Sequence, residues 1–171
     1  MSRSLLVTVG STKFDKLIGL IEKESKDFQV LLKRFRIQKV LIQHGRSKAP
    51  KLEITSDCEI KLIDYLNPEE MTKELASATI IISHGGAGTI FEILRGNLDN
   101  LESLIIVEND NLMDSHQSEL LESLMKMKCP IQRGNLGNLF ANIQVKKEEI
   151  IKFRLPEPDY KPLTALINNY L

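Results

Sequence analysis

The stretch from Ile82 to Leu94 reads ISHGGAGTIFEIL, and three glycines join an apolar run to a pattern of apolar residues at helical spacing. The run before the glycines is short and rich in isoleucine, which is typical of a buried strand. Glycine lets another group approach the backbone closely, although ordering it costs entropy. A turn at the start of a helix also presents free backbone N–H groups and the positive end of the helix dipole. The stretch therefore fits an anion-binding turn, and it fits equally well a tight strand-to-helix connection that only needs small residues.

The rest of the chain repeats this alternation of strand and helix. Apolar, β-rich runs predict further strands at residues 5–9, 39–45, 58–65, 104–107 and 129–132. Helical spacing predicts helices at residues 14–21, after the cap-like pair Asn67-Pro68, after the glycine turn, and from Asp114 onward. Most of the strands are continuously apolar, as in a parallel sheet that helices cover on both faces. We therefore expect an α/β fold.

The polar residues of this fold gather where strands end. In open parallel sheets ligands bind outside the carboxyl ends of the strands. The segments at those ends are Gly10-Ser11-Thr12, His44-Gly45-Arg46, Tyr65, residues 84–89 and residues 108–117. Their convergence favours a phosphate-type ligand at the glycine turn.

Composition limits the function further. The chain has 171 residues, 42% of them hydrophobic, as expected of one globular domain. The formal net charge is zero, which argues against nucleic acid as a partner. The two cysteines have no metal or redox spacing and indicate a reducing, cytosolic location. No targeting segment is visible, and no apolar run approaches the ~20 residues that span a bilayer.

Several catalytic motifs are absent from the sequence. It has no G-x-G-x-x-G at the first turn, no phosphate-binding G-x-x-x-x-G-K-[ST], no H-E-x-x-H, no C-x-x-C, no G-x-S-x-G and no D-x-D. We expect no cofactor. The histidines at 44, 84 and 116 all fall at strand ends or in a loop, but no carboxylate accompanies them at a ligand spacing, so we expect no metal site either.

Two further groups of residues have both a ligand-binding and a structural interpretation. Glu92 lies on the helix that follows the glycine turn, where its carboxylate would bind a ribose diol or simply be solvated. Asp114 is placed to cap the next helix. His116 and Gln117 follow in its first turn and are suited to a ligand with several hydroxyl groups.

The segments VTVGST, LIQHG, LID, ISHGGAGTIFE and NLMDSHQ, in this order, resemble the donor-binding half of the family 28 glycosyltransferases. Within that family they are most similar to the small catalytic subunits of eukaryotic UDP-N-acetylglucosamine transferases. The resemblance covers nearly the whole chain. It implies a Rossmann-like sheet, the C-terminal, donor-binding lobe of a GT-B glycosyltransferase.

The resemblance also implies roles for single residues. The glycine turn, Gly85 to Thr89, corresponds to the segment that holds the UDP diphosphate, Glu92 to the ribose ligand, and Ile63 to the residue whose backbone reads uracil. His116 and Gln117 correspond to the sugar-contacting pair, although bacterial members have two glutamines there. The predicted UDP-sugar site comprises Gly10, Ser11, Thr12, Ile63, His84, Gly85, Gly86, Ala87, Gly88, Thr89, Glu92, Asp114, His116 and Gln117.

The family further implies a partner, because a GT-B transferase has two lobes and 171 residues hold one. The resemblance implies a membrane-anchored second subunit at the cytosolic face of the endoplasmic reticulum, which binds the acceptor and carries the catalytic base. The expected reaction is inverting transfer of N-acetylglucosamine from UDP-GlcNAc to GlcNAc-diphosphodolichol, the second step of lipid-linked oligosaccharide synthesis. The chain alone would bind UDP-sugar weakly and catalyse nothing.

Two other functions remain open from the sequence. One is a nucleotide-sugar-binding regulatory module without turnover, and the other is a hydrolase or epimerase that uses His84 and Glu92 as acid and base.

We expect residues 1–155 to form the UDP-sugar-binding domain and residues 156–171 to form a proline-rich linker and a last helix. The apolar stripe of that helix would pack on its own domain, on the partner, or on both. The stripe consists of Leu163, Leu166, Ile167, Tyr170 and Leu171.

Overall fold

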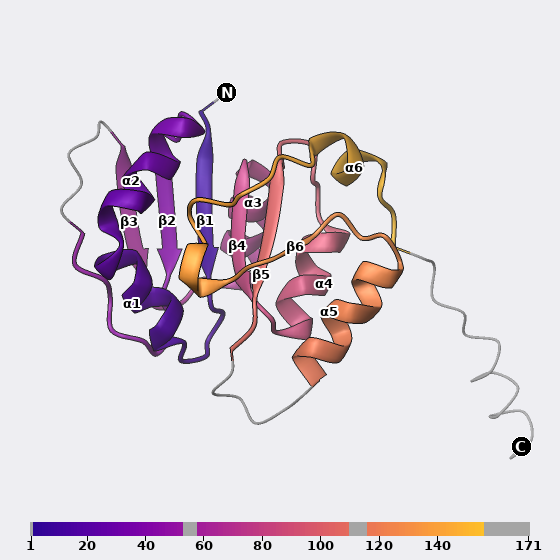
Figure 1. The fold of residues 1–171 in the computed structure, drawn as a ribbon, viewed down its shortest axis with the longest axis horizontal. Coiled ribbons are helices and arrows are strands. Elements are labelled where there is room, and N and C mark those ends of the chain that lie inside the picture. The colour runs from indigo at the N-terminus through magenta and orange to yellow at the C-terminus, as the bar shows by residue number, and fades with distance from the viewer. Residues whose placement is uncertain (1, 53–57, 110–115, 156–171) are drawn as a thin grey trace, which may run out of the picture.

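A six-stranded parallel sheet forms the centre of the protein (Figure 1). The computed structural model describes residues 2–52, 58–109 and 116–155. Within them the strand order is β3-β2-β1-β4-β5-β6, and each pairing is parallel. The strands are β1 (Ser4–Thr8), β2 (Lys39–Gln43), β3 (Glu59–Ile63), β4 (Ile80–His84), β5 (Ser103–Val107) and β6 (Gln132–Arg133).

Helices cover both faces of the sheet. They are α1 (Asp15–Lys23), α2 (Ser25–Arg34), α3 (Pro68–Ser77), α4 (Ala87–Arg95), α5 (His116–Lys126) and α6 (Lys147–Lys152), with a short 3-10 helix, η1 (Leu136–Asn138). In Figure 1, α1 and α2 lie in front of the strands and α3 lies behind them. Alternate residues of each strand point to opposite faces. Val7 accordingly packs with α1 and α2, while its neighbour Leu6 packs with α3, α4 and α5.

Burial follows position in the sheet. Every residue of β1, β4 and β5 is buried, whereas β3, at the edge, is largely exposed. This explains why β1, β4 and β5 read as continuous apolar runs. The predicted α/β fold with a parallel sheet covered on both faces is confirmed.

The helix predicted after Asn67 begins as its sequence indicates. The Asn67 side chain accepts a hydrogen bond from the Glu70 N–H at 2.9 Å, and the Glu70 carboxylate accepts one from the Asn67 N–H at 3.0 Å. Pro68, at the first helical position, needs no partner for a backbone N–H. This reciprocal cap fixes the start of α3 at the predicted residue.

Two helices were not predicted. The charged stretch between α1 and β2 contains α2, whose buried residues Phe28, Leu31 and Leu32 have helical spacing among many charged neighbours. Since only Glu24 separates α1 from α2, no turn residue marks the boundary. The second missed helix, α6, has six residues and one buried side chain, Ile150, which is too little to produce a periodic pattern.

The order of the strands reverses between β1 and β4. From β1 the chain moves outward to β2 and β3, then returns to the other side of β1 as β4 and continues to β5 and β6. The loops after β1 and β4 therefore leave the sheet edge in opposite directions, which is where open α/β sheets bind ligands. This topology places the loop that begins at Gly10 beside the glycine turn.

Two predicted features lie outside the described residues. Asp114 belongs to residues 110–115, and the linker and last helix belong to residues 156–171. The predicted cap at Asp114 and the division of the chain at residue 155 stay predictions.

Candidate functional site

The start of α4 carries free backbone donors. Gly86 is the N-cap residue and provides no side-chain hydrogen bond, and its carbonyl accepts the first helical bond, from Ile90 N–H at 3.0 Å. The N–H groups of Ala87, Gly88 and Thr89 therefore have no acceptor within the helix. Ala87 and Gly88 are exposed. Together with the helix dipole, this arrangement suits an anion.

The three glycines of the turn have different reasons to be glycine. A β-carbon on Gly86 would lie 2.2 Å from Nε2 of His84, and one on Gly85 would lie 2.5 Å from Oε1 of Gln117. These two glycines make room for side chains of the protein itself. A β-carbon on Gly88 would have no atom of another described segment within 4 Å. Only Gly88 leaves space for an external group, so the structural and the ligand-binding interpretations of the turn each hold for part of it.

His84 lies beneath the turn and is 4% exposed. Its ring fits between the loops after β1 and β4, since a β-carbon on Gly10 would lie 3.1 Å from its Cε1 atom. Burial lowers the pKa of the imidazole below 6.5, and the backbone of Thr8 opposes this shift in part. The ring is therefore neutral at pH 7. Its Nδ1 atom has no hydrogen-bond partner in the part of the chain that the structure describes.

The loop after β1 faces the glycine turn through Gly10. This residue has a φ of +59°, which favours glycine, and its β-carbon position is 3.7 Å from the Thr89 hydroxyl oxygen. The Thr12 hydroxyl donates to the Val9 carbonyl at 2.7 Å, so it stabilises the loop itself. Ser11 is exposed. The structure thus brings Gly10 and Thr89 together, and the Thr12 hydroxyl already has a partner inside the loop.

Gln117 joins this group from the first turn of α5. Its side chain lies against Gly85, and its Oε1 atom accepts a hydrogen bond from the Asn109 N–H at 3.1 Å. Asn109 follows β5, is 2% exposed, and donates through Nδ2 to the Lys13 carbonyl at 3.0 Å. Sequence reasoning missed Asn109 as a site residue. Its position directly after a buried strand, at the carboxyl edge of the sheet, was the signal available.

Glu92 and Gly88 share a groove between α3 and α4, with a volume of about 570 Å³. Glu92 is exposed and makes no hydrogen bond or ion pair with any residue that the structure describes. A carboxylate one turn beyond the free N–H groups is thus open to a ligand that extends along this groove.

Ile63 lies at the far end of the same edge, where β3 ends. Its carbonyl accepts a hydrogen bond from the His44 N–H at 2.9 Å, so this oxygen belongs to the sheet pairing. The strands β2 and β1 separate β3 from β4, which places Ile63 roughly 14 Å from the glycine turn at the usual strand spacing. This span suits an extended nucleotide.

The structure describes the remaining predicted site residues only in part. Asp114 lies outside the described residues, and of His116 only the backbone, in α5, is described. Among the residues with described side chains, no cluster of histidine, cysteine, aspartate and glutamate is able to hold a metal ion.

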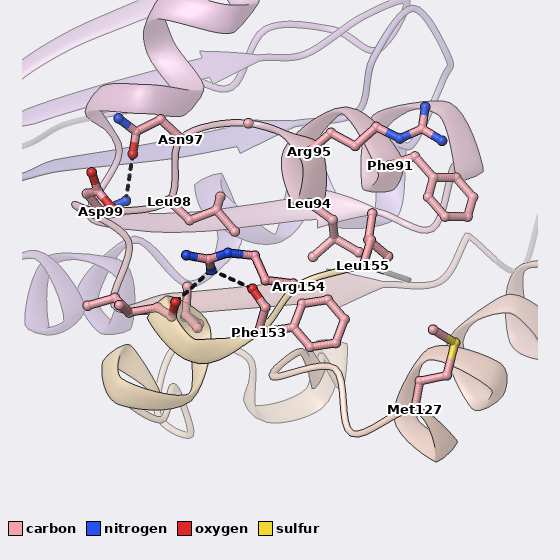
Figure 2. A pocket seen from close by; sticks show the side chains of 13 residues that line it. Phe91, Leu94, Arg95, Asn97, Leu98, Asp99, Met127, Phe153, Arg154 and Leu155 are labelled. Atoms are coloured by element: carbon pink, nitrogen blue, oxygen red, sulfur yellow. Dashed lines mark hydrogen bonds between the residues drawn. The ribbon is translucent and has the colours of Figure 1, made fainter. Parts of the chain in front are cut away.

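A larger pocket lies elsewhere, beside the carboxyl-terminal half of α4. It has a volume of about 890 Å³, and we call it the α4–α6 groove (Figure 2). Its apolar lining includes Phe91, Leu94, Met127, Phe153 and Leu155. The Arg154 guanidinium, which also lines it, donates to the carbonyls of Ile151 and Phe153 at 2.7 Å. Among its lining residues the groove has no free helix N-terminus such as the one at the glycine turn.

Residues 4–151 match the glycosyltransferase family 28 C-terminal domain. The chain belongs to this family. Membership confirms the predicted resemblance and, with the parallel sheet, the assignment as a C-terminal lobe of the GT-B type.

The similar curated proteins are named UDP-N-acetylglucosamine transferase subunit ALG13. The mouse protein is 31% identical over 121 residues, which cover 70% of this chain and 10% of the mouse protein. The protein of Yarrowia lipolytica is 24% identical over 165 residues, covering 95% of this chain and 81% of that protein. The chain thus spans about a tenth of the mouse relative and most of the yeast one.

Two solved structures show the same fold. The solution structure of ALG13 matches with a TM-score of 0.56 and 20% identity, over 82% of this chain and 83% of that one. The crystal structure of the glycotransferase of kitacinnamycin matches with a TM-score of 0.55 and 17% identity, over 80% of this chain and 31% of that one. In the second case the family 28 domain corresponds to one part of a longer transferase.

No helix within the described residues is both long and apolar enough to cross a bilayer.

Proposed function

We propose that this chain is the donor-binding subunit of a UDP-N-acetylglucosamine transferase, and that the diphosphate of UDP-GlcNAc lies at the N-terminus of α4. The observation that carries the proposal is an uncapped helix start, with open space at Gly88, at the switch point between β1 and β4. The names of the similar proteins support the choice of UDP-GlcNAc over other nucleotide sugars.

The backbone N–H groups of Ala87, Gly88 and Thr89 hold the diphosphate in this proposal. A negative group at a helix start is stabilised by about 0.3–1 kcal/mol in exposed positions, and by more where hydrogen bonds form as well. His84 is neutral beneath the turn, so the charge is balanced by backbone donors rather than by a cation of the site. This arrangement requires no metal.

The nucleoside then extends from the turn along the groove that Gly88 shares with Glu92. The Glu92 carboxylate accepts the two ribose hydroxyls, and the uracil reaches toward the backbone at Ile63. The sugar lies on the opposite side of the turn, against Gln117, His116 and the loop at Ser11. The exposed carboxylate of Glu92 and the contact between Gln117 and Gly85 support these two directions.

The acceptor is bound by a second, membrane-anchored subunit at the cytosolic face of the endoplasmic reticulum, which also supplies the catalytic base. The inverting transfer to GlcNAc-diphosphodolichol then takes place between the two lobes. The word "subunit" in the names of the relatives supports a partner. Burial of His84 disfavours the alternative in which His84 and Glu92 act as an acid–base pair, because a 4% exposed ring has little access to a substrate.

Calorimetric titration of the full chain with UDP, UDP-GlcNAc and UDP-glucose, in the presence of a chelator, tests the donor site. We expect UDP and UDP-GlcNAc to bind without metal, and UDP-glucose to bind less tightly than UDP-GlcNAc. Addition of a membrane fraction that contains the partner, with GlcNAc-diphosphodolichol, should then yield sugar transfer. Failure to bind UDP would refute the donor site. Binding of the donor without sugar transfer would favour a regulatory module that binds nucleotide sugars. Activity of the isolated chain would favour a hydrolase or epimerase.

A further inference from the structure

The loop after β2, residues 44–48, packs tightly against the loop after β1. A β-carbon on Gly45 would lie 2.2 Å from the Thr12 carbonyl oxygen, and Gly45 has a φ of +56°, so this position requires glycine. The Arg46 N–H donates to the same Thr12 carbonyl at 2.9 Å. The backbone of the loop after β2 is therefore fixed relative to the loop after β1.

Ser47 determines which side chains of this loop face outward. Its side chain is buried, its hydroxyl oxygen accepts a hydrogen bond from the Phe14 N–H at 2.8 Å, and its carbonyl oxygen accepts one from Nδ1 of His44 at 2.8 Å. Arg46 and Lys48, on either side of this buried residue, are both exposed. The loop thus presents two cations from a fixed backbone, and an anion that binds there need not order the chain further.

The acid that contacts this loop, Asp15, does not neutralise these two cations. Its carboxylate lies 3.1 Å from Nζ of Lys13, and hydrogen bonds from Lys13 and Ser47 lower the pKa of this carboxyl group below its usual value. By contrast, the side chains of Arg46 and Lys48 make no hydrogen bond or ion pair with any residue that the structure describes. Both positive charges are therefore open to an external anion.

The two cations lie at the same edge of the sheet as the glycine turn, but outside the groove assigned to the nucleoside. Strands β2 and β4 flank β1, so their carboxyl ends are two strand spacings apart, roughly 10 Å. The loop after β2 contacts the start of α1 through Phe14, whereas Gly88 and Glu92 line the groove between α3 and α4. Helices α1 and α3 cover opposite faces of the sheet (Figure 1). An anion at Arg46 and Lys48 is thus a second anion beside the one at α4.

We propose that Arg46 and Lys48 bind the diphosphate of the lipid-linked acceptor, so that this chain contributes to the acceptor site as well as to the donor site. The inference rests on the proposed function, in which the acceptor sugar lies between two diphosphates, the one that leaves with UDP and the one that carries the lipid. A separation of roughly 10 Å, two strand spacings, leaves room for that sugar ring. The planar guanidinium of Arg46 matches phosphate oxygens with paired N–H donors, and Lys48 adds a second charge.

Steady-state kinetics of the full chain with the membrane fraction that contains the partner test the inference. At saturating UDP-GlcNAc, Arg46→Gln should raise the KM for GlcNAc-diphosphodolichol about tenfold, the effect of a lost hydrogen bond to a charged group. Lys48→Gln should raise it about threefold, because a single exposed ammonium group contributes less than a two-pronged guanidinium. Arg46→Lys, which keeps the charge, should have an intermediate KM.

The affinity of the isolated chain for UDP, measured by calorimetry, should change less than about twofold in each variant, as expected of separate sites. Lys33→Gln is the matched control, because it removes an exposed lysine from the last turn of α2. It should change neither the acceptor KM nor the UDP affinity. Losses of UDP affinity as large as the increases in acceptor KM would assign the cations to the donor diphosphate and overturn the inference.

Anionic membrane lipids would also attract these cations. The same variants are therefore compared with a detergent-solubilised partner and a short-chain GlcNAc-diphospholipid, without anionic lipid, where the increase in acceptor KM should persist. Its disappearance would show that the cations bind the membrane surface, and the inference would be wrong. Unchanged acceptor KM with normal UDP binding would overturn this inference alone. If the wild-type chain neither binds UDP nor supports transfer, the proposed function fails, and this inference fails with it.

NMR of the isolated chain provides a measurement that needs no partner. With the donor site saturated by UDP, added inorganic pyrophosphate should shift the backbone amide signals of Arg46, Ser47 and Lys48. Arg46→Gln should weaken this second binding event about fivefold or more, and its circular dichroism spectrum should match that of the wild type because the replaced side chain is exposed. No response of these three amides to pyrophosphate would contradict the proposal.

Discussion

The two ends of α4 form two different surfaces. At its N-terminus, Gly88 leaves the backbone accessible, and the neighbouring loop after β1 contains Gly10, which has a positive φ. At its carboxyl-terminal end, Phe91, Leu94 and Arg95 line the α4–α6 groove, which is larger and combines apolar side chains with Asn97, Asp99 and Arg154 (Figure 2). The helix is only nine residues long, so one element carries both surfaces.

The difference shows that volume does not identify the functional site in this fold. The α4–α6 groove has about 890 Å³, against about 570 Å³ for the groove that Gly88 and Glu92 share. A diphosphate requires donors and positive potential, which the smaller groove has from the free helix start. The predictions below test whether the two surfaces act independently.

The largest effect is expected at Gly88. Gly88→Val should abolish UDP binding, because the added side chain occupies the open space at the turn. It should leave the fold intact, because no other segment that the structure describes has an atom within 4 Å of the new β-carbon. Gly86→Val is the matched variant. It should destabilise the domain by roughly 1–3 kcal/mol or more, since its β-carbon would lie 2.2 Å from the buried His84 ring.

Calorimetry for UDP and thermal unfolding for both variants measure this pair. If a folded Gly88→Val variant binds UDP with unchanged affinity, the turn is only a tight connection. Equal loss of stability in both variants would show that Gly88 is packed and not open.

The second effect concerns Glu92. If its carboxylate accepts the ribose hydroxyls, Glu92→Ala should weaken UDP binding by roughly 1.5–3 kcal/mol, the range for hydrogen bonds to a charged group. Pyrophosphate binding should barely change. Glu122→Ala, which removes an exposed acid from α5, is the control and should affect neither ligand. Equal losses for UDP and pyrophosphate would assign Glu92 a general electrostatic role instead.

The third prediction uses the buried imidazole. Burial lowers the pKa of His84 below its ordinary value of 6.5, so the unfolded chain binds a proton at this residue more readily than the folded chain. Stability then rises with pH wherever the unfolded state holds more protons. The contribution of His84 should be complete above about pH 6.5 and should decrease as the pH falls through that value toward the folded pKa.

Thermal unfolding between pH 7.5 and 5.5 measures this dependence. We expect the unfolding temperature of the wild type to fall across this range more than that of His84→Asn. A wild-type profile no steeper than that of the variant would show that His84 does not remain neutral in the folded protein.

The sequence predicted the interior of the fold better than its periphery. The central strands β1, β4 and β5 are buried on both faces, so their apolar runs are unambiguous. In α2, by contrast, three buried positions are interspersed with seven residues that include charged side chains, and the helical period is obscured. The start of α3 was predictable from local sequence, because the residues that form the Asn67 cap all lie within one turn of the chain.

The site was predictable only as far as local sequence shows it. ISHGGAGT predicts a strand, a turn and a helix, but no spacing reveals that Gly85 accommodates Gln117 or that Gly86 accommodates His84. These contacts depend on how α5 and the loops pack at the sheet edge. The hydrogen bonds of Asn109 depend on the same packing, because its partners Lys13 and Gln117 come from different segments.

The smallest effect on the donor site is expected from removal of residues 156–171. Leu155, the last residue before this segment, lines the α4–α6 groove, and the segment carries an apolar stripe at helical spacing. We propose that this stripe contributes to binding of the membrane-anchored partner at the α4–α6 groove, which shares Phe91 and Arg95 with the groove of Gly88 and Glu92. Truncation after Leu155 should then change UDP affinity by less than about twofold, because Gly88 and Glu92 do not line the α4–α6 groove. Pull-down with the partner should fail at temperatures where circular dichroism shows a folded domain.

Met127→Asp and Ile151→Asp, which place charges on exposed groove residues, should reproduce the loss of partner binding if the groove and the segment form one interface. A truncated, folded chain that supports full transfer with the partner would contradict this role. A truncated chain that also loses UDP binding would show that the two ends of α4 are coupled, and the comparison between them would no longer describe two independent surfaces.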